Sequence, residues 1–283
     1  MISIAIENGK GGVAKTTTSV HLAAGFAMSG LRVLLIDIDP QASIKSYFKI
    51  KLEKGNTLDF ILGKYHQDSI YPVDINIGSQ RFKMDVMPSS QRMQDFDDKT
   101  TGIPRREEIL KYRIEEEELY ENYDVIVIDC PPTLNLAIKN VLTFADYLLI
   151  PSEMEGMSVT GVHTVINSVQ FMYKYIKRKP KILGILPTKY DQRQRVSKDL
   201  YENCNEMFPG VKVFEPIRID SKIRKAYLQK KTVYECDPSA RVSKEYLRLT
   251  KEIIKIADLK NKMAKETHVK SAQSTTSEKL MEL

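Results

Sequence analysis

The sequence lacks any long apolar run, and no proline-, glycine- or serine-rich linker interrupts it before its C-terminal end. A membrane-spanning helix needs about 20 consecutive apolar residues, and no segment approaches that length. Residues 1–7 have no basic lead and no cleavage pattern, so they are typical of a strand rather than of a signal peptide. We therefore expect a cytoplasmic protein without a membrane span.

Cysteine is also scarce, with three residues, Cys130, Cys204 and Cys236, that lie far apart without metal-ligand spacing. This pattern is typical of plain thiols in a reducing compartment. The absence of a linker favours one large domain, although the length alone would allow two. Residues 271–277 are polar and small, and such a segment buries too little apolar surface to order itself. We expect a single domain over residues 1–258 and a polar, disordered tail over residues 259–283.

Charge is divided unequally along the chain. Residues 1–176 hold 18 Lys and Arg against 23 Asp and Glu, a net charge of 18 − 23 = −5, whereas residues 177–283 hold 25 against 14, a net of +11. The overall charge of +6 therefore belongs to the C-terminal part. Such an imbalance indicates attraction to a polyanion, either nucleic acid or an acidic membrane surface.

Short apolar runs alternate with segments of helical composition, which predicts an α/β fold with a mostly parallel, twisted sheet and helices on both faces. Residues 51–123 follow this pattern poorly, and we expect loops and helices around the sheet edge there, with one possible strand at 84–87. The other expected strands are 2–6, 33–38, 125–128, 147–150 and 182–186, and the expected helices are 16–29, 134–143 and 159–175.

A glycine-rich turn over residues 9–16, Gly-Lys-Gly-Gly-Val-Ala-Lys-Thr, lies between the first strand and the first helix. In that context backbone N–H groups converge on phosphate oxygens and the helix dipole adds positive potential. Lys15 would reach the β- and γ-phosphates, and Thr16 would supply its hydroxyl to Mg²⁺. The common pattern has glycine where this chain has Ala14, so we expect a negative φ at Ala14, which alanine adopts without strain. The residues expected to bind ATP are Gly9, Lys10, Gly11, Gly12, Val13, Ala14, Lys15, Thr16 and Thr17.

The run Lys-Gly-Gly-Val-Ala-Lys-Thr-Thr at residues 10–17 resembles the deviant Walker A loop of the P-loop ATPases in the ParA/MinD/Soj group. In that family the first lysine reaches across a nucleotide-sandwich dimer to the phosphates held by the other subunit. The resemblance implies this role for Lys10. It also implies a homodimer that forms with ATP and Mg²⁺.

Two later motifs continue the resemblance. Residues 34–42, Leu-Leu-Ile-Asp-Ile-Asp-Pro-Gln-Ala, are similar to the second motif of the family and favour its ParA branch. There Asp39 would position the attacking water and Asp37 would lie near the metal. Residues 125–132 resemble Walker B and the following switch, so that Asp129 would hold Mg²⁺, directly or through water. Each aspartate alone could instead end a strand or cap a helix. Three motifs in the expected order favour the catalytic interpretation. The expected catalytic residues are Lys10, Lys15 and Asp39.

The resemblance covers about residues 1–258, because 145–155 with Gly161 and 237–246 are also similar to ParA segments. It implies an ATP-dependent partition ATPase with slow basal turnover. Its ATP-bound dimer would bind double-stranded DNA without sequence preference, and a ParB-type centromere-binding partner would stimulate hydrolysis. Because the first strand begins at residue 2, we expect no preceding helix-turn-helix and hence no operator recognition. The protein would be associated with the nucleoid of a prokaryote.

Basic residues cluster between positions 218 and 231, where six cations accompany one acidic residue, and again near position 195. In ParA proteins the corresponding regions contribute to DNA binding, although such a run can also be a solvated helix face. The residues expected to contact DNA are Arg193, Arg195, Arg218, Lys222, Arg224, Lys225, Lys230 and Lys231.

Two other functions stay open from the sequence. A membrane-surface positioning ATPase of the MinD type would need a terminal amphipathic helix, whereas this chain ends in a polar tail. An electron carrier similar to nitrogenase reductase would need paired cysteines for a shared iron–sulfur cluster, and Cys130 has no suitable second ligand.

Overall fold

The computed structural model describes residues 1–64, 66–133, 135–154, 156–176 and 180–259. Within them a seven-stranded sheet has the order β3-β4-β2-β5-β1-β6-β7, and every neighbouring pair is parallel except β3 and β4. The predicted fold class is confirmed. The strands are β1 (Ile2–Ile6), β2 (Val33–Asp37), β3 (Tyr71–Ile77), β4 (Gln80–Met87), β5 (Val125–Asp129), β6 (Tyr147–Glu153) and β7 (Lys181–Thr188).

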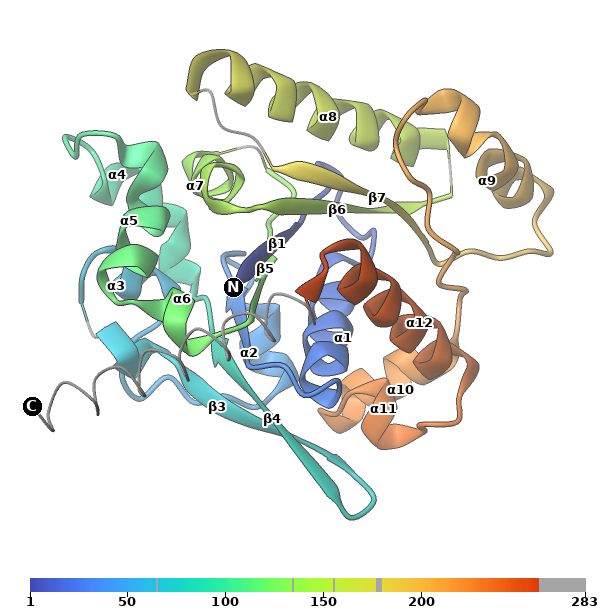
Figure 1. Ribbon diagram of the computed structural model, residues 1–283, viewed down its shortest axis with the longest axis horizontal. Helices are drawn as coiled ribbons and strands as arrows, with labels where there is room; N and C mark the ends of the chain where they lie inside the picture. Colours follow the sequence, from blue (N-terminus) through green and yellow to red (C-terminus); the bar gives the residue numbers. More distant parts are fainter. Residues whose placement is uncertain (65, 134, 155, 177–179, 260–283) are drawn as a thin grey trace, which may run out of the picture.

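Helices cover both faces of the sheet (Figure 1). One face carries α1 (Lys15–Met28), α2 (Ser43–Tyr47), α10 (Ser221–Gln229), α11 (Val233–Cys236) and α12 (Arg241–Ile256). The other carries α7 (Leu136–Phe144), α8 (Gly156–Ile176) and α9 (Arg195–Met207), together with the short helices α3 (Thr57–Ile61), α4 (Phe96–Lys99), α5 (Ile109–Glu116) and α6 (Leu119–Asn122). Three 3₁₀ turns complete the described elements: His66–Ser69, Gln91–Asp95 and Arg106–Glu108.

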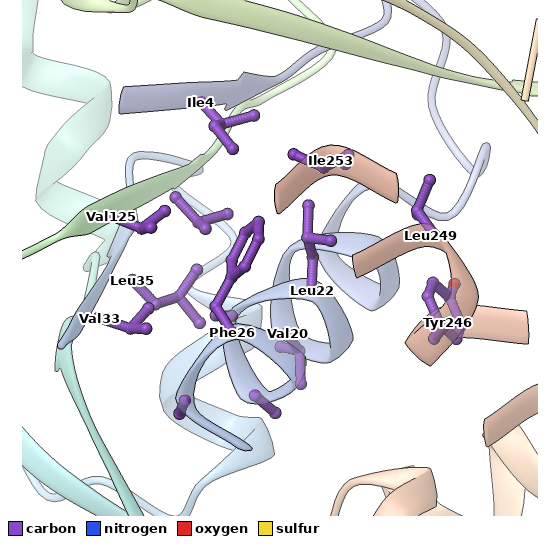
Figure 2. Close-up of a cluster of buried hydrophobic side chains, with 14 of the residues drawn as sticks. Ile4, Val20, Leu22, Phe26, Val33, Leu35, Val125, Tyr246, Leu249 and Ile253 are labelled. Carbon is purple, nitrogen blue, oxygen red and sulfur yellow. The ribbon is translucent and has the colours of Figure 1, made fainter. Parts of the chain in front are cut away.

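The core consists of two layers because successive strand side chains point to opposite faces. On β1, Ile4 joins the layer under α1, whereas Ala5 joins the layer under α7. Figure 2 shows Phe26 of α1 directed at the sheet beside Leu35, with α12 on the far side of α1. Burying a side chain such as Phe26 contributes roughly 1.5–3 kcal/mol. This burial stabilises the packing of α1 on the sheet.

A close helix contact holds α12 against α1. A Cβ atom at Gly25 would lie 2.4 Å from Oγ1 of Thr250, so glycine is required for this approach. The C-terminal helices therefore pack directly on the helix that begins at the phosphate loop.

The edge hairpin β3–β4 differs from the expectation for residues 51–123. The possible strand 84–87 is the end of the longer β4, and β3 had not been expected at all. Within β3 only Ile75 is buried, so the apolar signal is weak. Pro72 also interrupts the pattern, and proline is tolerated in a strand at the sheet edge, where β3 lies.

Core packing continues to the last residue that the structure describes at the C-terminal side. Leu259 is only 2% exposed and belongs to the core, so the packed domain includes at least this residue. The rest of the expected tail, 260–283, lies outside the described residues. The three cysteines are free thiols. None of the helices in the described part combines the length and apolarity that crossing a membrane requires.

Candidate nucleotide site

The three sequence motifs meet where β1, β2 and β5 end at the centre of the sheet. Asp129 is in register with Ile6 of β1 and with Asp37 of β2. Because parallel strands present their carboxyl ends at one edge, the loops after these strands share one site. The structure thus brings together the predicted phosphate loop and the predicted acidic residues.

The phosphate loop closes around Lys15, the first residue of α1. The Lys15 side chain is 7% exposed, and its Nζ donates to the carbonyl oxygens of Asn8 and Lys10, each at 2.9 Å. Thr188 at the end of β7 donates its hydroxyl to the carbonyl of Val13 at 3.0 Å. These hydrogen bonds hold the carbonyl oxygens of Asn8, Lys10 and Val13 in place. Gly11 and Gly12 stay exposed, with Gly12 at φ 80°.

Ala14 differs from the expectation of a negative φ. It has φ 65° and ψ 31°, the left-handed region, immediately before α1. That conformation costs an L-residue roughly 1–2 kcal/mol, and this cost explains why glycine is common at the position. Its carbonyl accepts from the Thr18 N–H at 2.9 Å, so the first turn of α1 holds the strained residue in place.

Asp129 is fully buried beneath the loop. Its Oδ1 accepts from the Ser19 hydroxyl at 2.9 Å, and the Thr16 hydroxyl also hydrogen-bonds its carboxylate. Its Oδ2 is buried without a hydrogen-bond partner among the described residues. Burial raises the pKa of Asp129 to about 7, against the hydroxyl hydrogen bonds that lower it. Ser19 is a site residue that the sequence motifs had not indicated.

Asp37 and Asp39 have different environments at the end of β2. Asp37 is fully buried and accepts backbone hydrogen bonds from Asp39 at 2.9 Å and Ile44 at 3.3 Å, so it shapes the following loop. Burial, and then the nearby Asp129, raise the pKa of Asp37. Asp39 is half-buried, and its Oδ1 accepts from the Gln41 N–H at 2.9 Å. Of the three motif aspartates, Asp39 is therefore the one that solvent can reach.

The donor set fits a magnesium ion that also binds a phosphate. Hard cations prefer oxygen ligands, and Mg²⁺ commonly takes one or two carboxylates with substrate phosphates. The unpartnered Oδ2 of Asp129 and the Thr16 hydroxyl supply such oxygens. In the described part of the chain, no three His, Cys, Asp or Glu side chains are grouped to hold a metal by themselves.

Glu7 is an acidic residue of the site that the sequence analysis missed. It follows β1, is fully buried, and neither carboxyl oxygen has a hydrogen-bond partner among the described residues. Burial raises the pKa of Glu7 to about 8; the positive charge of Lys15 opposes this shift, and the negative charge of Asp129 adds to it. A single glutamate before a glycine-rich loop has no pattern that could have revealed it.

We expect Glu7 to make stability fall as pH rises. Its folded-state pKa of about 8 lies above the ordinary 4.5, so between these values the folded protein holds a proton that the unfolded chain has lost. The free energy of unfolding should therefore fall by about 1.4 kcal/mol per pH unit in this range. Glu7→Gln should remove this decrease. Chemical denaturation from pH 5 to 8 measures it, with the exposed Glu121→Gln as control. If the free energy of unfolding changed with pH in the same way in wild type and Glu7→Gln, the raised pKa of Glu7 would be contradicted.

A cavity of about 640 Å³ opens beside Thr16 and Thr17. Its walls come from α1, α2, α10, α12 and the segment after β7, and the lining is largely apolar. Ligand pockets typically have volumes of roughly 300–1,000 Å³ with mostly apolar walls, so the cavity has the size and lining of a ligand pocket. Its apolar lining includes Tyr47, Ile217, Ile219, Ile223, Tyr227 and Tyr246.

The basic residues expected to contact DNA fall into two groups. Four are ion-paired: Arg193 with Asp191 at 2.7 Å, Arg195 with Asp199 at 3.8 Å, Arg218 with the buried Glu245 at 2.6 Å, and Lys222 with Asp237 at 2.6 Å. The exposed Arg224, Lys225 and Lys231 have no ion-pair partner among the described residues, and Lys230 lies 4.5 Å from the ring centre of Tyr227.

This fold and this site define a P-loop ATPase. A family model described as AAA domain (AAA_31) matches residues 1–182. The sporulation initiation inhibitor protein Soj of Bacillus subtilis (strain 168) is 33% identical over 250 residues, which cover 88% of this chain and 97% of Soj. The chain belongs to the ParA/Soj family of P-loop ATPases.

Solved structures show the same fold. Apo McdA of Cyanothece has a TM-score of 0.77 at 22% identity and covers 88% of this chain and 99% of its own. The septum site-determining protein MinD of Pyrococcus horikoshii OT3, complexed with Mg-ADP, has a TM-score of 0.69 at 21% identity. The match covers 90% of this chain and 97% of the MinD chain.

Proposed function

We propose that this protein is a DNA-partition ATPase in which Mg-ATP drives formation of a sandwich dimer that binds DNA without sequence preference. Hydrolysis, stimulated by a ParB-type centromere-binding partner, would release the dimer from DNA. The observation that carries the proposal is that one loop holds both Lys10 and Lys15 beside the strand-end carboxylates. The similarity to Soj supports this assignment. The proposal implies a cytoplasmic protein associated with the nucleoid.

The ATP phosphates would lie on residues 9–17, with Lys15 turning from the loop carbonyls to the β- and γ-phosphates. The nucleoside would occupy the cavity beside Thr17. Thr16 and Asp129 would hold Mg²⁺, and Asp37, whose oxygens already accept backbone hydrogen bonds, would act through water. When bound, Mg²⁺ neutralises phosphate charge.

Hydrolysis would depend on positioning and charge stabilisation. Asp39 would orient the attacking water, because among the three motif aspartates it is the one that solvent reaches. Lys15 of one subunit and Lys10 of the other would stabilise charge on the transferred phosphoryl group. A monomer has only one of these two lysines at its own phosphates, so basal turnover would be slow.

The DNA surface would centre on α10 and the turn after it. A cation already paired with a carboxylate adds little net attraction to a phosphate, which favours Arg224, Lys225, Lys230 and Lys231 over the paired group. Binding to phosphates without base contacts is independent of sequence. Two subunits in a dimer would present two such surfaces.

Replacing Lys225 and Lys231, two exposed lysines outside the nucleoside cavity, by alanine is expected to weaken ATP-dependent DNA binding and flatten its salt dependence. Each lost phosphate contact lowers the log–log slope by about 0.9, so the pair should lower it by about 1.8 per subunit. Fluorescence anisotropy with random duplex DNA across a salt series measures the slope. Arg193→Ala with Arg195→Ala removes the same charge from ion-paired positions. An equal or larger effect of that control pair would refute the choice of surface.

A membrane-surface positioning ATPase is the second candidate. The observation that favours it is the 69% exposed Leu228, which lies on α10 among the basic residues together with the exposed Tyr227. Apolar side chains surrounded by cations also suit an anionic bilayer surface. Co-sedimentation with anionic vesicles in ATP, without any retention by DNA, would favour this function over partition.

A further inference from the structure

We infer that Asn8 and Gly161 form a positioning pair through which helix α8 sets the place of Lys10. The inference rests on the proposed role of Lys10 in the partner's site. Neither residue would touch the nucleotide. Both would act on catalysis only through the lysine that crosses the dimer interface.

Asn8 connects three parts of the site. Its side-chain nitrogen donates to the Pro151 carbonyl of β6 at 2.7 Å, and its side-chain oxygen accepts from the Lys10 N–H at 3.0 Å. Its main-chain oxygen accepts from Nζ of Lys15 at 2.9 Å. Asn8 is fully buried, and its hydrogen bonds to Pro151 and Lys15 are shielded from water, whereas the one from Lys10 is partly buried. The side chain therefore fixes Lys10 relative to β6, whereas only the main chain contacts Lys15.

Gly161 lies directly against this amide. A Cβ atom at position 161 would lie 2.4 Å from Oδ1 of Asn8 and 3.4 Å from Cβ of Lys10. One turn along α8, Cγ2 of Thr164 lies 3.7 Å from the position that a Cβ at Gly9 would take. Residues three apart share one face of a helix. This face of α8 therefore lies along the loop from Gly9 to Lys10.

The atom that a methyl group would displace is the one that holds Lys10. Oδ1 of Asn8 accepts the Lys10 N–H, and a separation of 2.4 Å is far below van der Waals contact. Adding a methyl group at Gly161 must move the amide, α8 or both. The Lys15 contact uses the main-chain oxygen of Asn8 and is not in the path of that methyl group.

The test compares Gly161→Ala, Asn8→Ala and the double variant with Lys10→Ala and the control Asn167→Ala, which lies at an exposed position of α8. Gly161→Ala is expected to bind a fluorescent ATP analogue as wild type does. Its hydrolysis should fall on the order of 100-fold, the effect of a misplacement of about 1 Å. ATP-dependent dimerisation, measured by analytical ultracentrifugation, should weaken in parallel, as in Lys10→Ala.

The double variant separates positioning from general damage to the fold. Without the Asn8 side chain the added methyl group meets no amide, so the double variant should match Asn8→Ala rather than show the sum of both losses. Normal dimerisation and hydrolysis in Gly161→Ala, alongside their loss in Lys10→Ala, would overturn the inference and leave the proposed function standing. Additive losses would overturn it too. A fully active Lys10→Ala would instead overturn the proposed function and the inference with it.

Discussion

Lys10→Ala is expected to bind ATP as the wild-type monomer does but to lose hydrolysis on the order of 10³-fold, the low end of what a cation supplied across an interface contributes. Lys15, not Lys10, is the buried lysine whose Nζ lies against the loop carbonyls, ready to meet phosphates in its own subunit. Lys10 would act only in the partner's site, so ATP-dependent dimerisation should be lost together with hydrolysis. Nucleotide titration, ultracentrifugation and phosphate release measure the three properties separately.

Lys15→Ala is the matched control for this prediction. It removes the other lysine of the same loop and should abolish ATP binding itself, so that every later step fails. If Lys10→Ala behaved like Lys15→Ala in the binding titration, Lys10 would belong to the subunit's own phosphate site. Normal dimerisation and hydrolysis by Lys10→Ala would contradict the sandwich mechanism.

Asp39→Asn is expected to lower hydrolysis roughly 100-fold, comparable to the loss of one transition-state hydrogen-bond partner, while ATP-driven DNA binding persists. Asparagine keeps an oxygen that can accept the Gln41 N–H, so the loop after β2 retains its hydrogen bond. The substitution removes only the charge that would orient water. Single-turnover hydrolysis and the lifetime of the DNA complex measure both effects.

Gln41→Ala serves as the control for Asp39→Asn because it alters the exposed neighbour without removing its backbone donor. Its hydrolysis should stay close to wild type. A wild-type rate in Asp39→Asn would remove the residue from the catalytic assignment. A short-lived DNA complex in Asp39→Asn would show that release from DNA does not require hydrolysis.

The parallel sheet could be predicted because its central strands are buried on both faces and form continuous apolar runs, such as 125–128. The hairpin partner β3 could not, since its half-exposed pattern contains one buried residue and a proline. The three aspartates of the site, but not Glu7, could be placed because strand ends in a parallel sheet meet at one edge. Their proximity followed from topology, without any knowledge of side-chain contacts.

Two features of the site depend on contacts that sequence order does not contain. The left-handed conformation of Ala14 arises where the loop turns into α1, and alanine itself does not favour it. The basic residues could be identified in the sequence, but the ion pairs that neutralise four of them could not be predicted. Arg218 meets Glu245 of α12, 27 positions further along the chain, only after α12 packs on α1.

The most direct test of the ATP-gated DNA switch is binding of random-sequence duplex DNA across a salt series without nucleotide, with ADP and with ATP. Wild type and Lys15→Ala are compared under the same conditions. The proposal predicts that only wild type with ATP binds DNA, with an affinity that falls steeply as salt rises. Binding that is absent, or that is the same in all three nucleotide states, would contradict it.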